Sequence, residues 1–421
     1  MEGPVDAIDY AGTETDESFS VLRLCSVFEP PEHVDPATVA SFDPIGGMQN
    51  HTAELTRALD RLGFRQTVVT SRPPGYPPVS RAGRFTVRRV ELPIPTFRQF
   101  YGVAAATRVA RLDRHDVVHM HLGEDLAIVP LGTLASKRRA PTVLTIHCDL
   151  GRTFNGRGAR AAVLRSFGSR LERIGARQAH AVIVLSESAK KAMLEWSIEE
   201  ERVHVIPPGV VPELFKGPFA DPLPSVGRPR IIYVGRIAQQ KDVQTLVRAV
   251  AFLRSNAHLV IVGDGPDRRR MERLAESLGI RERLTITGFV RHEKVPAFLH
   301  HADVLVLPSR FEELGSVLLE GMCIGMPIVA SRVRGITSVI DHESNGLLVS
   351  PGDSQGFAAA IDRVLANRLL ARRLAHQSHA GSARFTWSSL ADRVASIYLD
   401  VLDEARRPSA PRNMLSRRDA R

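Results

Sequence analysis

Two glutamates separated by seven residues are the feature of this sequence that most directly indicates chemistry. Glu312 and Glu320 lie in the segment PSRFEELGSVLLEGMCIGMPIVAS. Glu312 is expected in a loop, and Glu320 about one turn into a helix that starts near Gly315 and Ser316, so both carboxylates can point to one side. Carboxylates accept hydrogen bonds from vicinal hydroxyls, as in a sugar and a ribose, and free amides at a helix start favour a phosphate. Taken alone, the simpler interpretation of the pair is that Glu312 caps a loop and Glu320 faces solvent.

Two cations in the segment YVGRIAQQKD favour the binding interpretation of the glutamate pair. Arg236 directly follows a predicted strand and Lys241 precedes the next predicted helix, which places both at the carboxyl edge of one sheet. Positive charges there can neutralise a diphosphate leaving group, although single cations are more often surface charges. The sequence has no Asp-x-Asp, the usual carboxylate clamp for a metal-bound diphosphate, so we predict a reaction without a metal ion.

The alternation of elements predicts an α/β fold that would position these residues. Short β-branched runs, such as VLRLCSVF, QTVVTS and PTVLTIH in the first half and RIIYVGR, HLVIVGDG and ADVLVLPS in the second, are separated by helix-forming sequence. This pattern predicts two parallel sheets with crossover helices. Residues 212–229 are rich in proline and glycine and are predicted to be a linker. Ligands bind beyond the carboxyl ends of such strands, so two facing domains would share one site.

The predicted organisation has further segments around this linker. Two Rossmann-like domains are expected at 20–211 and 230–384, and residues 385–404 have the apolar spacing of a helix that packs back across the first domain. Residues 1–19 and the basic residues 405–421 are expected to be flexible tails.

Composition excludes several classes of protein. The 421 residues, 43% hydrophobic, suffice for two separate cores. Cys25, Cys148 and Cys323 lack metal or redox spacing, and the first twenty residues lack an apolar segment, so we expect a cytoplasmic protein without an export signal. The apolar runs are too short to span a membrane. The net charge of +10 comes from scattered arginines with only 6% aromatics, which does not indicate nucleic-acid binding.

Between Val21 and about Leu402 the chain resembles the family 4 retaining glycosyltransferases of the GT-B fold. The matching motifs are the Gly46-Gly47 loop with His51, the strand-end His147, Gly235-Arg236 with Lys241, Gly263-Asp264-Gly265-Pro266, and the segment from Glu312 to Glu320. The resemblance implies two facing Rossmann-like domains, of which the first binds the acceptor and the second binds a nucleotide sugar. It also implies that no cofactor or metal is needed beyond this donor.

Donor-binding roles follow from the resemblance. It implies that Glu320 binds the ribose hydroxyls and that Val290 lies beside the base. The other implied donor contacts, through backbone amides or positive charge, come from Gly47, Arg236, Lys241, Gly315, Ser316 and Val317. The usual Glu-Gly-Phe-Gly of the family reads Glu-Glu-Leu-Gly here, so Glu313 replaces a glycine and leaves the details of the sugar pocket open.

The resemblance implies that His147, Arg236, Lys241 and Glu312 are the catalytic residues, with Glu312 contacting the transferred sugar. Retention without a carboxylate nucleophile implies that the leaving phosphate takes the acceptor proton on the same face. His147 would then position or polarise a substrate instead of acting as an obligatory base. Without the resemblance, a buried histidine with satisfied hydrogen bonds would be an equally good interpretation. His119 and His121 are expected beside it, on the strand face opposite Val118 and Met120.

Three acids in first-domain loops, Glu124, Asp125 and Asp149, are candidate acceptor-binding residues. Carboxylates suit an aminocyclitol with ammonium groups, whereas a phosphorylated acceptor would favour lysine or arginine. Each acid alone could equally be a helix cap. Residues 42–72 resemble the N-acetylglucosaminyltransferases that act on 2-deoxystreptamine in aminoglycoside antibiotic biosynthesis. This resemblance implies UDP-N-acetylglucosamine as donor and N-acetylparomamine as product.

A second hypothesis rests on residues 152–178, which carry seven arginines and one glutamate with helical apolar spacing. Such a segment could be the interfacial helix of a membrane-associated hexosyltransferase that acts on a lipid, a polysaccharide or a phosphorylated cyclitol. Phe154 and Phe167 are its only aromatic anchors, which favours a solvated helix and at most a weak peripheral contact. A non-catalytic sugar-nucleotide binder or an epimerase is disfavoured by the complete motif set. The expected partners are a small-molecule donor and acceptor, and the sequence leaves the oligomeric state open.

Overall fold

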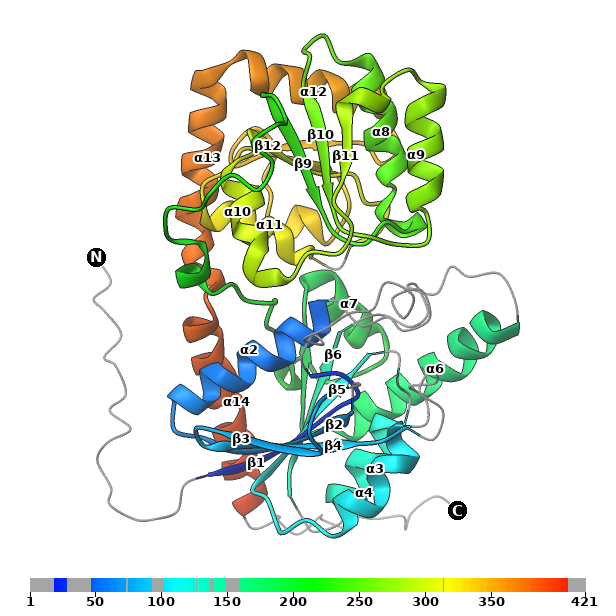
Figure 1. The fold of residues 1–421 in the computed structure, drawn as a ribbon. Coiled ribbons are helices and arrows are strands. Elements are labelled where there is room, and N and C mark those ends of the chain that lie inside the picture. The colour runs from blue at the N-terminus through cyan, green and yellow to red at the C-terminus, as the bar shows by residue number, and fades with distance from the viewer. Residues whose placement is uncertain are drawn as a thin grey trace, which may run out of the picture.

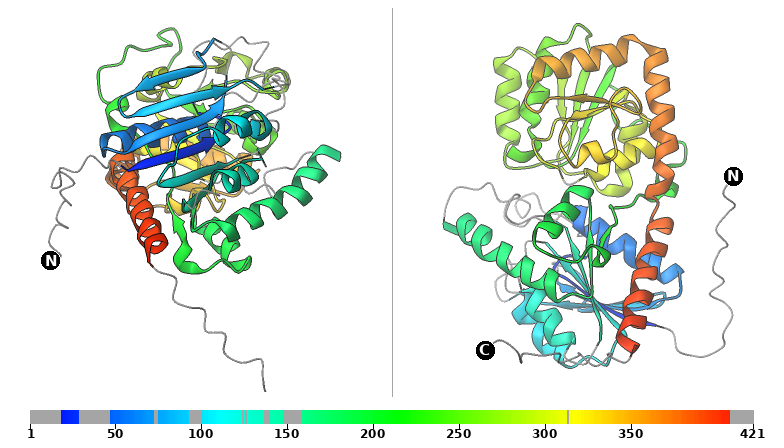
Figure 2. Two further views of the ribbon diagram at one scale, coloured as in Figure 1. Left: turned by 90° about the horizontal axis from the view of Figure 1, so that it is seen from below. Right: turned by 180° about the vertical axis from the view of Figure 1, so that it is seen from behind.

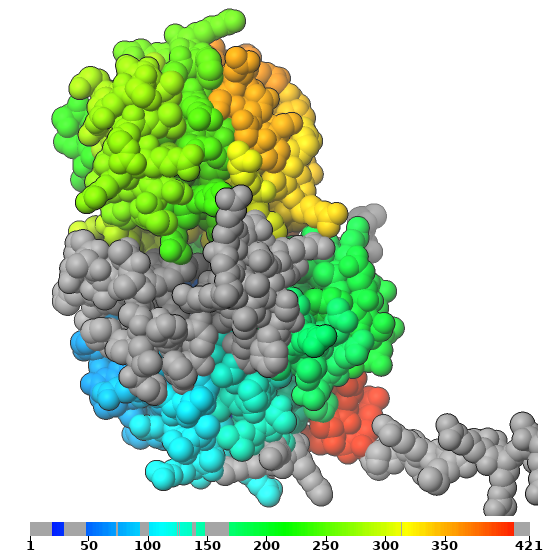
Figure 3. All heavy atoms as spheres, turned by 90° about the vertical axis from the view of Figure 1, so that its right-hand side faces the viewer, coloured from blue at the N-terminus to red at the C-terminus, as the bar shows by residue number. Residues whose placement is uncertain are grey.

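The computed structural model describes residues 19–28, 47–72, 75–92, 101–123, 125, 127–136, 140–147, 159–312 and 314–407. These residues form two lobes, each built on one sheet that is covered by helices on both faces (Figure 1). Figure 3 shows the second lobe stacked on the first, with the C-terminal helix reaching the first lobe. The prediction of a two-lobed α/β fold with mostly parallel sheets is confirmed.

The first lobe contains an eight-stranded sheet of order β3-β4-β2-β1-β5-β6-β7-β8. Its strands are β1 (Ser20–Cys25), β2 (Arg65–Ser71), β3 (Val79–Ala82), β4 (Phe85–Val90), β5 (Val117–Leu122), β6 (Thr142–Ile146), β7 (Ala181–Val184) and β8 (Val203–Val205). All neighbours are parallel except β3 and β4, which form an antiparallel pair at one edge. Strands β3, β4 and β8 were not predicted, because these short strands carry polar residues and lack a long apolar run.

Two layers of helices bury the faces of the first sheet. These helices are α2 (Gly47–Arg61), α3 (Tyr101–Ala110), α4 (Ile128–Ser136), α6 (Ala159–Gln178) and α7 (Glu187–Glu195). One core lies between the sheet and α3 and α4, and includes Met120 and Leu144. The other lies between the sheet, α2 and the C-terminal helix α14 (Trp387–Arg406), and includes Leu59 and Tyr398.

The second lobe contains a six-stranded, fully parallel sheet of order β11-β10-β9-β12-β13-β14. Its strands are β9 (Arg230–Val234), β10 (His258–Val262), β11 (Leu284–Ile286), β12 (Val304–Leu307), β13 (Ile328–Ser331) and β14 (Leu347–Val349). Its helices are α8 (Val243–Phe252), α9 (Arg268–Ser277), α10 (Val295–His300), α11 (Ser316–Cys323), α12 (Ser354–Ala366) and α13 (Arg368–Ser382). One apolar core joins both faces of this sheet to its helices.

The chain passes between the lobes twice, and the two passages lie side by side. The amide of Val210 donates to the carbonyl of Phe385 at 2.8 Å, and the amide of Trp387 donates back to Val210 at 3.1 Å. Gly209 is required here because a Cβ would lie 2.6 Å from the Trp387 ring. Helix α14 then packs against α2, as predicted for the C-terminal segment (Figure 2). Its N-cap is Thr386, whose side chain accepts a hydrogen bond from the amide of Ser389.

Residues 212–229, which the sequence predicts to be a linker, belong structurally to the surface of the second lobe. Phe215 is buried in the core of that lobe. His300 and His301 contact the carbonyls of Phe215 and Phe219 through Nε2, at 2.8 and 2.7 Å. These contacts hold the segment against α10. The first passage from one lobe to the other is therefore near Val210 and not within residues 212–229.

Candidate active site

Lys241 and Glu312 form a close ion pair at the carboxyl edge of the second sheet. The Lys241 ammonium donates to Glu312 Oε1 at 2.8 Å and to Oε2 at 2.6 Å. The hydroxyl of Ser309, which follows β12, also donates to Glu312 Oε2, at 3.0 Å. The Glu312 side chain is only 10% exposed. The structure therefore brings two predicted site residues together in a partly desolvated pair, and it adds Ser309, which sequence reasoning missed.

A strained turn presents Lys241 to this pair. Asp242, the next residue, adopts a left-handed conformation with φ 45°. Its buried carboxylate accepts hydrogen bonds from Thr245 Oγ1 at 2.7 Å and forms an ion pair with Arg310 Nε at 2.9 Å. A non-glycine residue keeps this conformation only when surrounding contacts hold it. These contacts fix the Lys241 backbone against the segment that carries Glu312.

Glu320 lies on α11 and is paired with a histidine that sequence reasoning missed. His292 Nε2 lies 3.0 Å from Glu320 Oε1. Burial opposes protonation of His292, but the carboxylate of Glu320, with Glu293 and Glu54, outweighs it and raises the pKa of His292 above its usual range. His292 stands a few residues after β11, so its strand-end position was the signal that could have found it. The pair holds Glu320 in one orientation.

Glycines bring the loops after β9 and β10 into backbone contact beside these pairs. A Cβ on Gly263 would lie 2.0 Å from the carbonyl oxygen of Gly235, and one on Gly265 would lie 2.3 Å from that of Ile237. Both approaches exclude any side chain. Arg236 lies in this contact with its side chain exposed, and its carbonyl accepts a hydrogen bond from the Tyr233 hydroxyl at 2.8 Å.

The start of α11 has the features of an anion-binding helix terminus. Gly315 has φ 85° and precedes the helix without a side-chain cap, so the amides of Ser316 and Val317 lie in its first turn. A Cβ on Gly315 would lie 2.9 Å from Leu307 Cδ2 and 3.2 Å from Glu312 Cγ, which places this turn against the ion pair. Uncapped amides at a helix start favour a phosphate or another anion. Val290 packs at the edge of the second-lobe core after the positive-φ residue Gly288.

The first lobe contributes a row of histidines at the end of β5 and β6. His121 Nδ1 lies 3.0 Å from His147 Nε2, and the ring of His51, on α2, stands edge-on 4.7 Å from His147. His119 lies on the same strand face as His121, as predicted, and contacts Tyr398 of α14 at 2.6 Å and Thr145 at 2.7 Å. Burial and the charge of Arg23 lower the pKa of His147 to about 3. His147 is therefore neutral at physiological pH.

A buried arginine beneath this row was not expected from the sequence. Arg23, in β1, is 1% exposed, and its NH2 lies 2.7 Å from His121 Nε2. The guanidinium also donates to the carbonyl of Thr52, the hydroxyl of Thr56 and Gln66 Oε1. Among the described residues no carboxylate pairs with it. A charged residue in the middle of a buried strand was the available signal.

Comparison with known proteins identifies the family of this chain. The Glycosyltransferase Family 4 model matches residues 45–214, and the Glycosyl transferases group 1 model matches residues 219–380. The 2-deoxystreptamine N-acetyl-D-glucosaminyltransferase of Streptomyces fradiae is 32% identical over 371 residues, which are 81% of this chain and 87% of the relative. The 2-deoxystreptamine glucosyltransferase of Streptomyces kanamyceticus is 30% identical over 345 residues, 76% of this chain and 89% of the relative. The chain is a family 4 glycosyltransferase.

A solved structure agrees with this family. The sucrose-phosphate synthase of Thermosynechococcus elongatus superposes with a TM-score of 0.78 at 25% identity, over 92% of this chain and 100% of that chain. The predicted GT-B fold and the predicted family are confirmed. The roles of individual residues remain predictions, which the geometry groups into a second-lobe set and a first-lobe set.

The acceptor-binding acids are the part of the prediction that the structure supports least. Glu124 and Asp149 lie outside the described residues, as do Cys148 and Glu313. Asp125 is only 1% exposed, and its Oδ1 accepts the amide hydrogen of Ala127 at 3.0 Å, just before α4. This contact lies in the loop before the helix, and the acceptor-binding role of Asp125 stays a prediction. Gly47 is the first described residue of α2, and its contact with a phosphate stays a prediction.

The three-histidine cluster of His51, His121 and His147 has the compactness of a metal site, since their ligand atoms lie within 4.8 Å of one another. The proton positions oppose this use. Arg23 can only donate, so its contact occupies the lone pair of His121 Nε2 and leaves the proton on Nδ1. Neither nitrogen of His121 then offers a lone pair to a metal. We retain the prediction that the reaction needs no metal ion.

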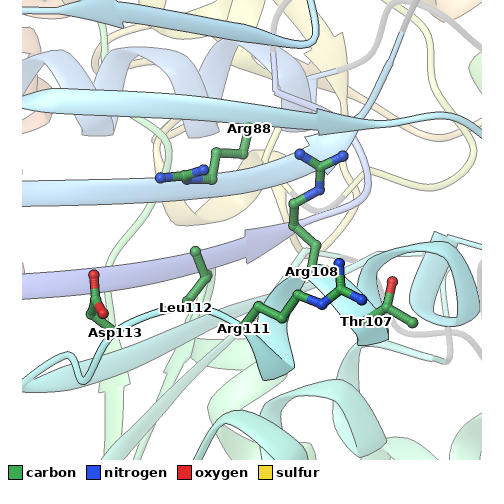
Figure 4. Close-up of a pocket in the computed structure, with 6 residues that line it drawn as sticks. All are labelled: Arg88, Thr107, Arg108, Arg111, Leu112 and Asp113. Atoms are coloured by element: carbon green, nitrogen blue, oxygen red, sulfur yellow. The ribbon is translucent and has the colours of Figure 1, made fainter.

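A cavity of about 400 Å³ lies away from the predicted residues, between β4 and the end of α3 (Figure 4). It is lined by Arg88, Thr107, Arg108, Arg111, Leu112 and Asp113. The guanidinium groups of Arg88 and Arg111 point in opposite directions in this view, so they do not converge on one anion.

A membrane-spanning helix is not found among the described residues, since none of their helices has both the length and the apolar character that a span needs.

Proposed function

We propose that this family 4 glycosyltransferase moves N-acetylglucosamine from UDP-N-acetylglucosamine to a hydroxyl of 2-deoxystreptamine, forming N-acetylparomamine in aminoglycoside antibiotic biosynthesis. The observation that carries the proposal is the match to two relatives that are both named for 2-deoxystreptamine and that cover most of this chain. These relatives differ in the sugar they are named for, glucose or N-acetylglucosamine. The acceptor is therefore better supported than the donor.

In this proposal the second lobe holds the donor. Glu320, oriented by His292, accepts hydrogen bonds from the ribose hydroxyls, and Val290 lies beside the base. Arg236 and Lys241 neutralise the diphosphate together with the first amides of α2 and α11. Glu312, held by Lys241 and Ser309, contacts the transferred sugar.

The proposed chemistry is a transfer with retention of configuration. The bond between the anomeric carbon and the diphosphate oxygen breaks, the acceptor oxygen bonds to the same face of that carbon, and its proton passes to the leaving diphosphate. Two observations support this route. Lys241 pairs with Glu312 beside the uncapped start of α11, and His147, which is neutral, hydrogen-bonds to no carboxylate among the described residues. Developing negative charge is the feature that fixed cations stabilise most.

A donor and acceptor panel tests this function. The purified protein, treated with EDTA, is given UDP-, GDP- and ADP-sugars with 2-deoxystreptamine, and the product is identified by mass and by the anomeric coupling in its NMR spectrum. We expect a singly N-acetylglucosaminylated, α-linked product from UDP-N-acetylglucosamine. Product with UDP-glucose alone would change the donor, and transfer only to other acceptors would refute the aminocyclitol assignment.

The membrane-associated alternative depends on the arginines of α6, and two of the described ones have internal partners. Arg173 stacks over the Trp196 ring at 5.4 Å, and Arg177 donates to the Trp196 carbonyl at 3.0 Å. These contacts attach α6 to the region after α7 and support a structural role. Sedimentation with anionic vesicles separates the two hypotheses. We expect the protein to stay in the supernatant, and protein that pellets with the vesicles would support a lipid acceptor.

A further inference from the structure

A hydrogen-bonded chain runs from the core of the first lobe to the candidate catalytic histidine. It begins at Arg23, passes through both ring nitrogens of His121 and ends on His147 Nε2, with contacts of 2.7 and 3.0 Å. All three residues sit on adjacent strands or directly after them, because β1, β5 and β6 are neighbours in the sheet. The chain therefore belongs to the rigid part of the lobe.

The direction of every proton in this chain follows from its first member. A guanidinium has donors and no acceptor, so His121 Nε2 must accept. A neutral imidazole carries one N–H, which then lies on His121 Nδ1 and donates to His147 Nε2. His147 in turn must carry its own proton on Nδ1. This assignment needs both rings to be neutral, and their burial beside Arg23 ensures it.

We propose that Arg23 and His121 are positioning residues that hold His147 in the Nδ1–H tautomer, so that His147 donates a hydrogen bond to a substrate oxygen and cannot accept the acceptor proton. The inference rests on the proposed function and deepens it. His147 is half-buried, and its Nδ1 has no hydrogen-bond partner among the described residues. A donor at this position can polarise a hydroxyl or orient the sugar while the leaving diphosphate takes the proton.

The buried Arg23 cation explains why the hydrogen bonds from Arg23 to His121 and from His121 to His147 are all donated in the same direction. Without Arg23, either ring could be reversed and each tautomer would be similarly stable. A guanidinium without a carboxylate partner can be retained only if its donors are all used, and His121 satisfies two of them, Nε at 3.3 Å and NH2 at 2.7 Å. Tautomers of ligand-facing histidines are commonly set by the partner of the other nitrogen.

The test measures the tautomer directly. Full-length protein labelled with ¹⁵N-histidine is examined by long-range ¹H–¹⁵N correlation, and the His147 signals are assigned by their loss in His147→Asn. We expect the Nδ1–H pattern in the wild type. In Arg23→Met the Nε2–H form should appear, and kcat should fall about tenfold while the Kd for UDP stays within about twofold.

A double variant and two controls keep the test decisive. Arg23→Met/His121→Phe removes the buried charge and its acceptor together, at similar volume, and replaces Arg23→Met should the latter not fold. Arg230→Met removes a buried arginine of the second lobe, and His119→Gln removes a buried histidine that does not contact His147. Both controls should keep the Nδ1–H pattern.

Two results would overturn the proposal: an Nε2–H or doubly protonated His147 in the wild type, or an unchanged tautomer in the double variant. Failure of the proposed function appears separately, because the tautomer is read without substrate. If the protein shows the Nδ1–H pattern but transfers no sugar to 2-deoxystreptamine, the proposed acceptor is wrong and the proposed role of Arg23 and His121 still stands.

Discussion

Charge is handled differently in the two lobes of this glycosyltransferase. In the second lobe each acid of the candidate site faces a base, Glu312 facing Lys241 and Glu320 facing His292. In the first lobe a buried Arg23 lies beneath a row of histidines whose pKa values are lowered by burial, without a carboxylate partner among the described residues. One site is built from ion pairs and the other from neutral, directional hydrogen bonds.

The difference matches what each lobe is proposed to bind. A diphosphate brings its own charge, and an ion pair such as Lys241 with Glu312 offers a cation that can be shared with it when it arrives. An acceptor hydroxyl is neutral and must be oriented. A fixed N–H can orient it, and a neutral N–H does not bind ions from solution. Removal of charge from the second lobe, or protonation of the histidines in the first, tests this difference between the lobes.

Removal of the Lys241 charge should have the largest effect. Lys241→Met leaves the diphosphate with one fewer cation and leaves Glu312, largely buried, without its partner. We expect kcat/KM to fall by about 10²–10³-fold, the usual cost of losing one preorganised charge at a leaving group. The matched control is Lys216→Met, since Lys216 is exposed and its ion pair among the described residues is a long 3.9 Å contact with Glu213. Near-normal kinetics in Lys241→Met would remove Lys241 from the site.

Glu320→Ala should have the next largest effect, on donor binding. It removes an acceptor proposed for the ribose hydroxyls and the partner of His292. Hydrogen bonds to a charged group contribute about 1.5–3 kcal/mol, so the Kd for UDP should rise about 10–100-fold. Glu320→Gln keeps an acceptor oxygen and should recover part of the loss. Titration calorimetry with UDP measures both, and an unchanged affinity in the alanine variant would place the ribose elsewhere.

The sequence predicted the second-lobe site better than the first. Glu312, Lys241 and Glu320 were found because their signal is local: each follows a strand or starts a helix within a short segment. Arg23 and His292 were missed because their partners are distant in sequence, 98 residues away for Arg23 and His121 and 28 for His292 and Glu320. Ser309 was missed although Glu312 is three residues away, because a serine after a strand carries no signal of its own. The acceptor-binding role of Asp125 stays a prediction, because a buried loop acid can bind a substrate or bond to the backbone of its own loop, as Asp125 does to Ala127.

Acidification should change the stability contributions of the two lobes in opposite directions. The folded pKa of His147, about 3, lies below its usual 6.5, so between these values the unfolded chain binds more protons and stability falls as pH falls. His292 has the opposite sign: its raised pKa gives stability that is present below pH 6.5 and lost as pH rises through the folded value. From pH 7 to 5.5, the His147 contribution should cost about 1 kcal/mol. Urea unfolding of wild type and His147→Asn at both pH values measures it, and an equal pH dependence of the two proteins would contradict a neutral His147.

Ser309→Ala should have the smallest effect and distinguishes the role of the hydroxyl from that of the ion pair. The hydroxyl donates one hydrogen bond to Glu312 Oε2 at 3.0 Å, while Lys241 keeps both carboxylate oxygens engaged. Because both oxygens stay paired with Lys241, we expect the loss to cost only about 0.5–1.5 kcal/mol, less than for a charged group left without a partner, so kcat/KM should fall about 2–10-fold. Ser309→Cys, which keeps a weak donor, serves as the matched control. If Ser309→Ala instead matched the loss of Lys241→Met, the orientation of Glu312 would depend on the hydroxyl, and the second-lobe site would resemble the first lobe in relying on neutral hydrogen bonds.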